Sequence, residues 1–318
     1  MFLSPRRCSF VSRLLIGIFL SGLAISASAE VRVLTSIKPL QLIAAAVQDG
    51  IGSPEVLLPP GASAHNYALR PSDVRRVRAV ELLYWIGPDM EVFMPRVLAG
   101  RSQLTVAVQE LPGLQLRHFG QVSPAGEHEP AAPSVAGEHD HDHRPGTLDA
   151  HLWLLPANAQ LIATRMAADL SAADPANAPR YQANLQAFIS RGQALDQRVK
   201  ARLAPVLGKP YFVFHEAFDY FEAAYGLKHA GVFSVASEVQ PGAQHVAQMR
   251  ARLQAAGPTC VFSEPPLQPR LAQTLSAGLP VTLAELDAMG GQLPVNSTAY
   301  EQLLTQLADA LAGCLEPL

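Results

Sequence analysis

The feature that most constrains the fold is an alternation of short apolar runs with helical segments, which occurs in two series along the chain. This alternation favours parallel sheets whose strands are connected by helices. In the first series we expect strands at 31–37, 55–58 and 82–86, and helices at 39–48, 71–80 and 91–98. In the second series we expect strands at 211–214, 228–232, 260–263 and 281–283, and helices at 217–225, 244–255, 269–275 and 300–311.

A long segment of helical composition, residues 175–203, separates the two series. Asp174 suits the N-cap position, and Pro175 suits the first helical position, where its missing N–H breaks no hydrogen bond. We therefore predict an α/β protein of two lobes, each with a mostly parallel sheet flanked by helices, joined by one long rigid helix. The predicted N-terminal lobe is 30–157, the connecting helices are 158–205, and the C-terminal lobe is 206–318.

Residues 1–29 have the pattern of an export signal. They contain three arginines and no acid, then an apolar run at 14–25, and end in Ala27-Ser28-Ala29, a typical cleavage site. The run is short for a membrane span, and no later stretch approaches about 18 consecutive apolar residues. We expect a signal peptide at 1–29 and a soluble protein in the periplasm.

The composition excludes two classes of protein. With 49% hydrophobic and 16% charged residues, the chain of 318 residues is not expected to be disordered. Residues 1–29 hold three of the 24 Lys and Arg and none of the 27 Asp and Glu, so the remainder has a formal charge of −6. Nucleic acid is therefore not an expected partner, because its phosphates require basic neutralisation.

Two cysteines, Cys260 and Cys314, lie beyond the predicted signal peptide. In an oxidising compartment two such cysteines are more often paired than free, so we expect a disulfide between them. Two buried thiols are the alternative.

A histidine-rich stretch interrupts the first series. It covers about 118–147, within a region rich in Pro, Gly and Ala, and is longer than the loops of compact domains. Its alternating imidazoles and carboxylates predict weak, auxiliary binding of a divalent metal, with a solvated polar loop as the alternative. The candidate auxiliary ligands are His128, His139, His141 and His143.

Four other metal-competent side chains have related positions. His65, His215 and Asp287 each follow a predicted strand, and His151 stands at the edge of the connecting region. Ligands of open α/β sheets gather beyond the carboxyl ends of the strands, so these side chains could converge between the lobes. Three imidazoles with a carboxylate or water suit tetrahedral Zn²⁺.

Several motifs in this chain resemble those of one known family. The sequence is similar to the periplasmic solute-binding component of zinc-uptake ABC transporters (ZnuA type), within the metal-receptor group. The resemblance covers nearly the whole chain after the signal peptide. Its motifs run from Pro60 to Tyr67, Leu69 to Asp73, Trp85 to Asp89, Asp149 to Leu154, Phe214 to Phe221, Cys260 to Pro265 and Glu285 to Asp287.

This resemblance implies two α/β lobes with zinc between them, bound by His65, His151 and His215. It implies Asp287 as a carboxylate ligand, although some relatives use a water or an acid beside the first histidine, where this chain has Ala64. It also implies an ABC permease and its ATPase as partners, a non-enzymatic role, and an auxiliary histidine loop. We expect a monomer, with a periplasmic zinc chaperone as a further possible partner.

Three alternatives differ in cargo or in class. A manganese or iron receptor of the same group is one, although manganese receptors resemble this chain with glutamate where His215 stands. A chaperone that hands zinc to another protein is the second. A secreted zinc-dependent hydrolase is the third, but the residues from His215 to Asp219 lack the second histidine of an H-E-x-x-H motif.

Overall fold

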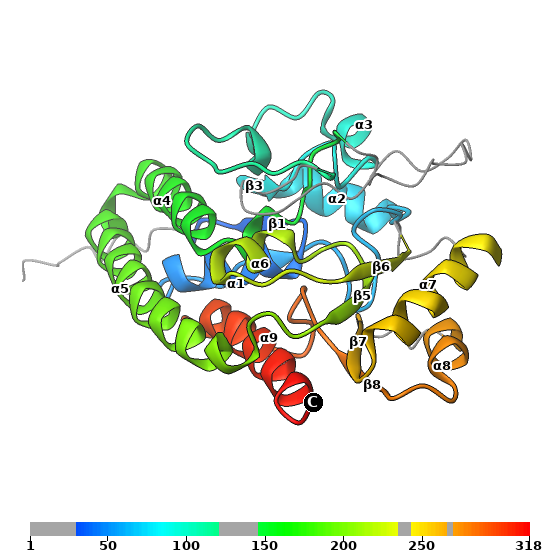
Figure 1. The fold of residues 1–318 in the computed structure, drawn as a ribbon. Coiled ribbons are helices and arrows are strands. Elements are labelled where there is room, and N and C mark those ends of the chain that lie inside the picture. Colours follow the sequence, from blue (N-terminus) through cyan, green and yellow to red (C-terminus); the bar gives the residue numbers. More distant parts are fainter. Residues whose placement is uncertain (1–29, 121–145, 235–242, 266–269) are drawn as a thin grey trace, which may run out of the picture.

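The computed structural model describes residues 30–120, 146–234, 243–265 and 270–318. It contains two four-stranded parallel sheets, one in each lobe (Figure 1). The first sheet has the order β2-β1-β3-β4, and the second has the order β6-β5-β7-β8. Within these described ranges, no helix is long and apolar enough to cross a membrane. The predicted fold class is confirmed.

The strands of both sheets are short. Those of the first sheet are β1 (Val33–Thr35), β2 (Glu55–Val56), β3 (Leu82–Trp85) and β4 (Leu104–Ala107). Those of the second are β5 (Tyr211–His215), β6 (Gly231–Ser234), β7 (Thr259–Ser263) and β8 (Val281–Glu285). In each sheet the chain order reverses beside the first strand, between β1 and β3 and between β5 and β7, and such reversals are where ligands of α/β folds bind.

Helices flank the sheets and connect them (Figure 1). The first lobe contains α1 (Lys38–Val47), α2 (Pro71–Ala79) and α3 (Met94–Leu98). The connection contains α4 (Pro156–Ala173) and α5 (Ala178–Leu203). The second lobe contains α6 (Asp219–Tyr225), α7 (Ala243–Ala256), α8 (Arg270–Ser276) and α9 (Ala299–Leu315).

A layer of four helices holds the two lobes together. Helix α1 is apolar nearly all round, with nine of its ten residues buried, and it packs against α4, α5 and α9. A helix without a polar face is stable only when it is enclosed in this way. Helix α9 follows the last strand in sequence, yet it contacts both α1 and α5. One core therefore extends through both lobes, and a smaller cluster around Phe212 and Phe233 belongs to the second lobe.

Three local predictions need correction. The connecting helix begins at Ala178, because Pro175–Asn177 form a 3₁₀ turn after α4 and Asp174 accepts a hydrogen bond from the Asn177 side chain at 2.7 Å instead of capping α5. The helix expected at 91–98 is shorter in the structure, where α3 covers Met94–Leu98. Strand β4 was not predicted, since its four residues carry a weak pattern next to polar turn residues.

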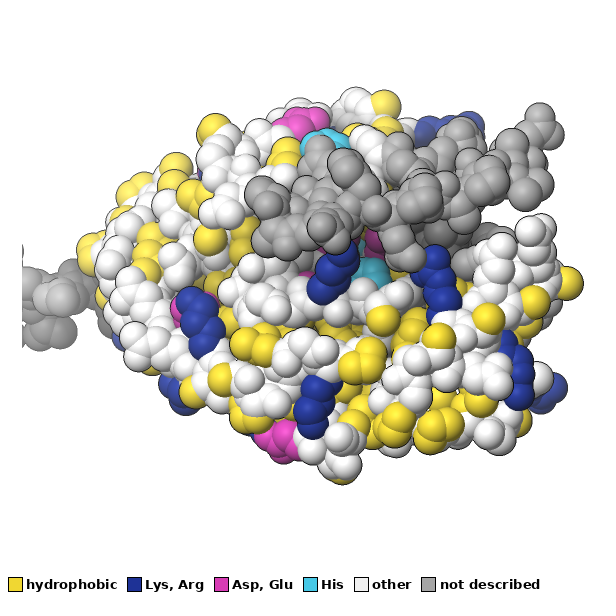
Figure 2. All heavy atoms as spheres, in the orientation of Figure 1, with side chains coloured by type: hydrophobic (Ala, Val, Ile, Leu, Met, Phe, Trp, Pro, Cys, Tyr) yellow, Lys and Arg dark blue, Asp and Glu magenta, His cyan; other side chains and the backbone are white. Residues whose placement is uncertain are grey.

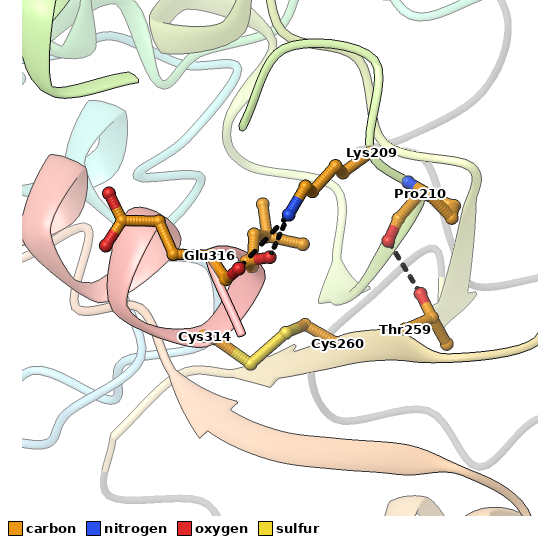
Figure 3. Close-up of a disulfide and its surroundings, with 7 residues drawn as sticks. Lys209, Pro210, Thr259, Cys260, Cys314 and Glu316 are labelled. Atoms are coloured by element: carbon orange, nitrogen blue, oxygen red, sulfur yellow. Dashed lines mark hydrogen bonds between the residues drawn. A yellow bond between two sulfur atoms is a disulfide. The ribbon is translucent and has the colours of Figure 1, made fainter. Parts of the chain in front are cut away.

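The end of α9 is attached to the second sheet (Figure 3). Cys314 of α9 forms a disulfide with Cys260 of β7, and their Cα atoms are 6.3 Å apart. Nearby, Lys209 Nζ donates to the Leu315 carbonyl at 2.8 Å, and Thr259 Oγ1 donates to the Pro210 carbonyl at 2.7 Å. The two hydrogen bonds connect the segment before β5 to strand β7 and to helix α9.

Candidate metal site

Three imidazoles from distant parts of the chain face one another. His65 lies in the loop after β2, His151 precedes the 3₁₀ turn Leu152–Leu154, and His215 ends β5. Their ring centroids are 5.1–5.7 Å apart, and one nitrogen of each lies within 4.8 Å of the others. His151 and His215 are both 4% exposed, whereas His65 is partly exposed. This spacing suits three nitrogen ligands around one ion, and His65 is the most exposed of the three.

A buried carboxylate orients His151. Asp149 Oδ1 lies 2.8 Å from Nδ1 of the ring and also accepts the His151 backbone N–H at 2.9 Å. Tyr220 of α6 donates its hydroxyl to the Asp149 carbonyl at 2.9 Å. Burial raises the pKa of the Asp149 carboxyl well above its usual range, and the nearby Asp219 raises it further. A carboxyl group bonded at Nδ1 fixes the ring and leaves Nε2 for a metal.

A second carboxylate orients His215. Glu264 Oε1 lies 2.7 Å from Nδ1 of His215. The contact follows from the pairing of β5 with β7, because Val213 lies opposite Phe262 and the same register continued by two residues sets His215 beside Glu264. Nε2 of this ring is again the nitrogen left for an ion.

Neither carboxylate was predicted to have a role. Asp149 stands in the motif that contains His151, and Glu264 stands in the motif from Cys260 to Pro265. Glu264 could have been found from the two predicted strands, because it follows the strand at 260–263 much as His215 follows the strand at 211–214. Asp149 could have been found from its position two residues before His151.

Asp287 lies on the wall of the same cavity but is held by its own turn. Its Oδ1 accepts the N–H groups of Met289 at 2.9 Å and Gly290 at 2.8 Å, and its Oδ2 accepts that of Gly291 at 2.8 Å. Gly290 has a φ of +61°, and a Cβ there would come within 2.9 Å of Leu293, so the turn requires glycine. Asp287 is not part of the group whose ligand atoms lie within 4.8 Å of one another, and its role as a ligand stays a prediction.

The cavity has a volume of about 430 Å³ and is lined by both lobes. The loop 59–65 closes one side, and Glu264, Pro265 and the Asp287 turn close the other. Trp153 lines the floor: its Nε1 donates to the Ala288 carbonyl at 2.9 Å, and its own carbonyl accepts the Tyr300 hydroxyl at 2.8 Å. The 3₁₀ turn before α4 is therefore bonded directly to the Asp287 turn.

The predicted auxiliary ligands His128, His139, His141 and His143 lie outside the described residues. The two ends of that stretch are adjacent, because His118 and Leu148 form an antiparallel bridge. The Arg117 N–H, at one of these ends, donates to the Tyr220 hydroxyl at 2.9 Å, which places the base of the stretch beside α6.

Comparison with known proteins gives consistent matches over nearly the whole chain. A family model described as zinc-uptake complex component A, periplasmic, matches residues 33–314. The high-affinity zinc uptake system protein ZnuA of Yersinia pestis is 38% identical over 297 residues, which cover 91% of this chain and 92% of that protein. The protein of the same name in Brucella abortus (strain 2308) is 34% identical over 320 residues, covering 93% and 96%.

Solved structures share the fold. A crystal structure of ZnuA superposes with a TM-score of 0.73 at 21% identity, covering 90% of this chain and all of that one. The manganese-bound solute-binding protein FpvC from Pseudomonas aeruginosa gives 0.72 at 18% identity, covering 91% and 99%. Because the family model spans most of the sequence and the relatives exceed 30% identity over almost their whole length, this chain belongs to the family of periplasmic zinc-uptake complex component A.

Proposed function

We propose that this chain is the zinc receptor of an importer: it binds Zn²⁺ between its lobes and delivers it to an ABC permease whose ATPase drives transport. The observation that carries this proposal is the group of three imidazoles with nitrogens within 4.8 Å of one another. Carboxyl groups orient two of these rings, so the site is formed before an ion arrives. The close relatives are named as zinc uptake proteins.

The donor atoms favour zinc over manganese or iron. Three imidazole nitrogens supply a borderline donor set, and the fourth position is open to water or to Asp287. Manganese favours sites with more oxygen ligands. The fold alone does not choose the metal, since a manganese-bound protein shares it, so the argument for zinc rests on the side chains and on the relatives.

A receptor explains the carboxylates better than a hydrolase does. A metallohydrolase needs a general base next to the metal-bound water. Here Asp149 and Glu264 bond to Nδ1 of the two buried rings, so they orient ligands. Glu216, the acid next to His215 in sequence, lies with Asp219 and His229 in a separate group.

The remaining parts of the proposal concern the chain outside the cavity. We place the protein in the periplasm, in agreement with the description of its family. We further propose that it is a monomer and that residues 1–29 are removed. We assign His128, His139, His141 and His143 to weak auxiliary binding. Delivery to a permease through a periplasmic chaperone would use the same cavity.

The decisive experiment is a competitive titration of residues 30–318 with zinc, manganese and iron. We compare the wild type with His65→Ala/His151→Ala/His215→Ala and with His118→Ala, a matched control outside the cavity. The proposal expects one tight zinc equivalent in the wild type and the control, and its loss in the triple variant. Tight zinc binding by the triple variant would place the site elsewhere, with the histidine-rich stretch next to be tested.

A deletion separates the two kinds of binding. Removing 127–143 should leave the tight equivalent unchanged and abolish weaker ones. Loss of the tight equivalent in the deletion would refute the division between main and auxiliary sites.

A further inference from the structure

A second group of possible metal ligands lies beside α6. Glu216 follows β5, Asp219 is the first residue of α6, and His229 precedes β6. One ligand atom of each lies within 4.8 Å of the others, and all three side chains are partly exposed. Among the described residues this is the one such group besides the three histidines of the cavity.

His229 is oriented in the same way as the two buried histidines of the cavity. Its Nδ1 lies 3.0 Å from both carboxylate oxygens of Glu222 and 3.9 Å from Oδ1 of Asp219. Glu222 is buried and is itself held by the Tyr211 hydroxyl, which donates to Oε1 at 2.6 Å. A ring fixed through Nδ1 by a carboxylate presents Nε2 as the ligand atom.

The group has an excess of acid in a partly buried place. Glu216, Asp219 and Glu222 contribute three carboxylates, faced by His229, Arg117 and Lys228. Carboxylates this close together repel one another when they are ionised, and a dication between them would offset that repulsion.

The space-filling view shows the types of side chain on this side of the molecule (Figure 2). Helix α6 and strand β6 lie near the middle of the face drawn in Figures 1 and 2. There, parts of histidine and acidic side chains are visible between Lys and Arg side chains (Figure 2).

We propose that Glu216, Asp219 and His229 form a second divalent-cation site, weaker than the cavity, with Glu222 as the positioning residue of His229. One nitrogen and two carboxylate groups suit Zn²⁺ and tolerate harder ions such as Mn²⁺. The site does not depend on which ion the three histidines bind.

The donor set and the exposure make this site the weaker one. It offers one imidazole and two carboxylates, all partly exposed, whereas the cavity offers three imidazoles, two of them buried. The first zinc ion fills the cavity, and the site beside α6 fills at higher zinc.

The test counts zinc equivalents in the full chain from residue 30, with His128, His139, His141 and His143 changed to alanine to remove their contribution. Three versions of this background are titrated against a weak chromophoric chelator: the background itself, Asp219→Asn, and His229→Gln, whose amide can still donate to Glu222. Asp309→Asn is the matched control, because it removes an exposed carboxylate that pairs with Arg202 on α5.

We expect the background and Asp309→Asn to bind one tight and one weaker equivalent. Asp219→Asn and His229→Gln should keep the tight equivalent and bind the second at least about tenfold less tightly. If both variants bind two equivalents as the background does, or the background binds only one, the second site is refuted. Circular dichroism checks folding, and Glu216→Gln replaces any variant that fails to fold. Loss of the tight equivalent would concern the cavity and not this site.

Discussion

Nδ1 of His215 lies 2.7 Å from Oε1 of Glu264, so the last residue of β5 is joined to the residue that follows β7. The two strands are neighbours in the second sheet, and the bond crosses the point where its chain order reverses. A similar bond joins His151 to Asp149. Two of the three proposed ligands are therefore held in place by the protein before an ion binds, and each bond can be tested separately.

The first prediction concerns the carboxylate of Glu264. Glu264→Ala should weaken zinc binding by about 10- to 100-fold, because the ring of His215 loses its orienting acceptor. Glu264→Gln should cost less, since its amide oxygen still accepts the Nδ1 proton. Chelator competition measures both affinities, with Glu110→Ala as an exposed control that does not line the cavity. Equal affinity in Glu264→Ala and the wild type would show that the bond has no role in binding.

The second prediction concerns the choice of metal. His215→Glu replaces a nitrogen donor by oxygen, so the ratio of zinc to manganese affinity should fall by at least about tenfold. His215→Ala removes the donor and should weaken both metals without favouring manganese. Parallel titrations with the two ions measure the ratio. An unchanged ratio in His215→Glu would contradict the argument that the third imidazole selects zinc.

The third prediction concerns the pH dependence of stability and the carboxyl group of Glu91, which has no part in the proposed metal binding. This buried carboxyl accepts hydrogen bonds from the Ser36 hydroxyl and from the N–H groups of Ile86, at 3.2 Å, and Gly87, at 3.0 Å. Burial nevertheless raises its pKa to about 7. The folded protein therefore retains a proton that the unfolded chain releases above its ordinary pKa of 4.5.

The titration of Glu91 should make the folded protein less stable as pH rises. As pH rises from about 4.5 to 7, the contribution of Glu91 to the free energy of unfolding should fall by up to about 3 kcal/mol. Glu91→Gln should lose this slope while other carboxyl groups titrate as before. Urea unfolding of metal-free protein at several pH values in that range measures the difference. Parallel pH profiles for the two proteins would contradict the assignment.

The fourth prediction concerns the disulfide. Cys260 and Cys314 are 54 residues apart in sequence, so removing the bond should lower the free energy of unfolding by about 4 kcal/mol in the chain-entropy model. Neither cysteine lines the cavity, so zinc affinity of the folded protein should change little. Urea unfolding and zinc titration of Cys260→Ala/Cys314→Ala measure the two effects. Unchanged stability would show that the bond adds nothing to the packing of α9 on β7.

Local patterns allowed much of the fold to be predicted. Apolar runs and helical periodicity depend on neighbouring residues, so seven of the eight strands and the main helices were predicted near their observed positions. Strand β4, whose local signal is weak, was not predicted, and the start of the connecting helix was wrong because Pro175–Asn177 form a turn. The motifs around His65, His151 and His215 also indicated the metal and the family before any geometry was known.

The sequence by itself determined the two α/β lobes, the three histidines and the kind of donor atoms they supply. Only the tertiary structure showed that Glu264 bonds to His215, that the Asp287 carboxylate accepts three N–H groups of its own turn, and that His229 joins Glu216 and Asp219 beside α6. The physical reason is that residue types and periodicity are local, whereas these contacts depend on strand register and helix packing between segments far apart in the chain.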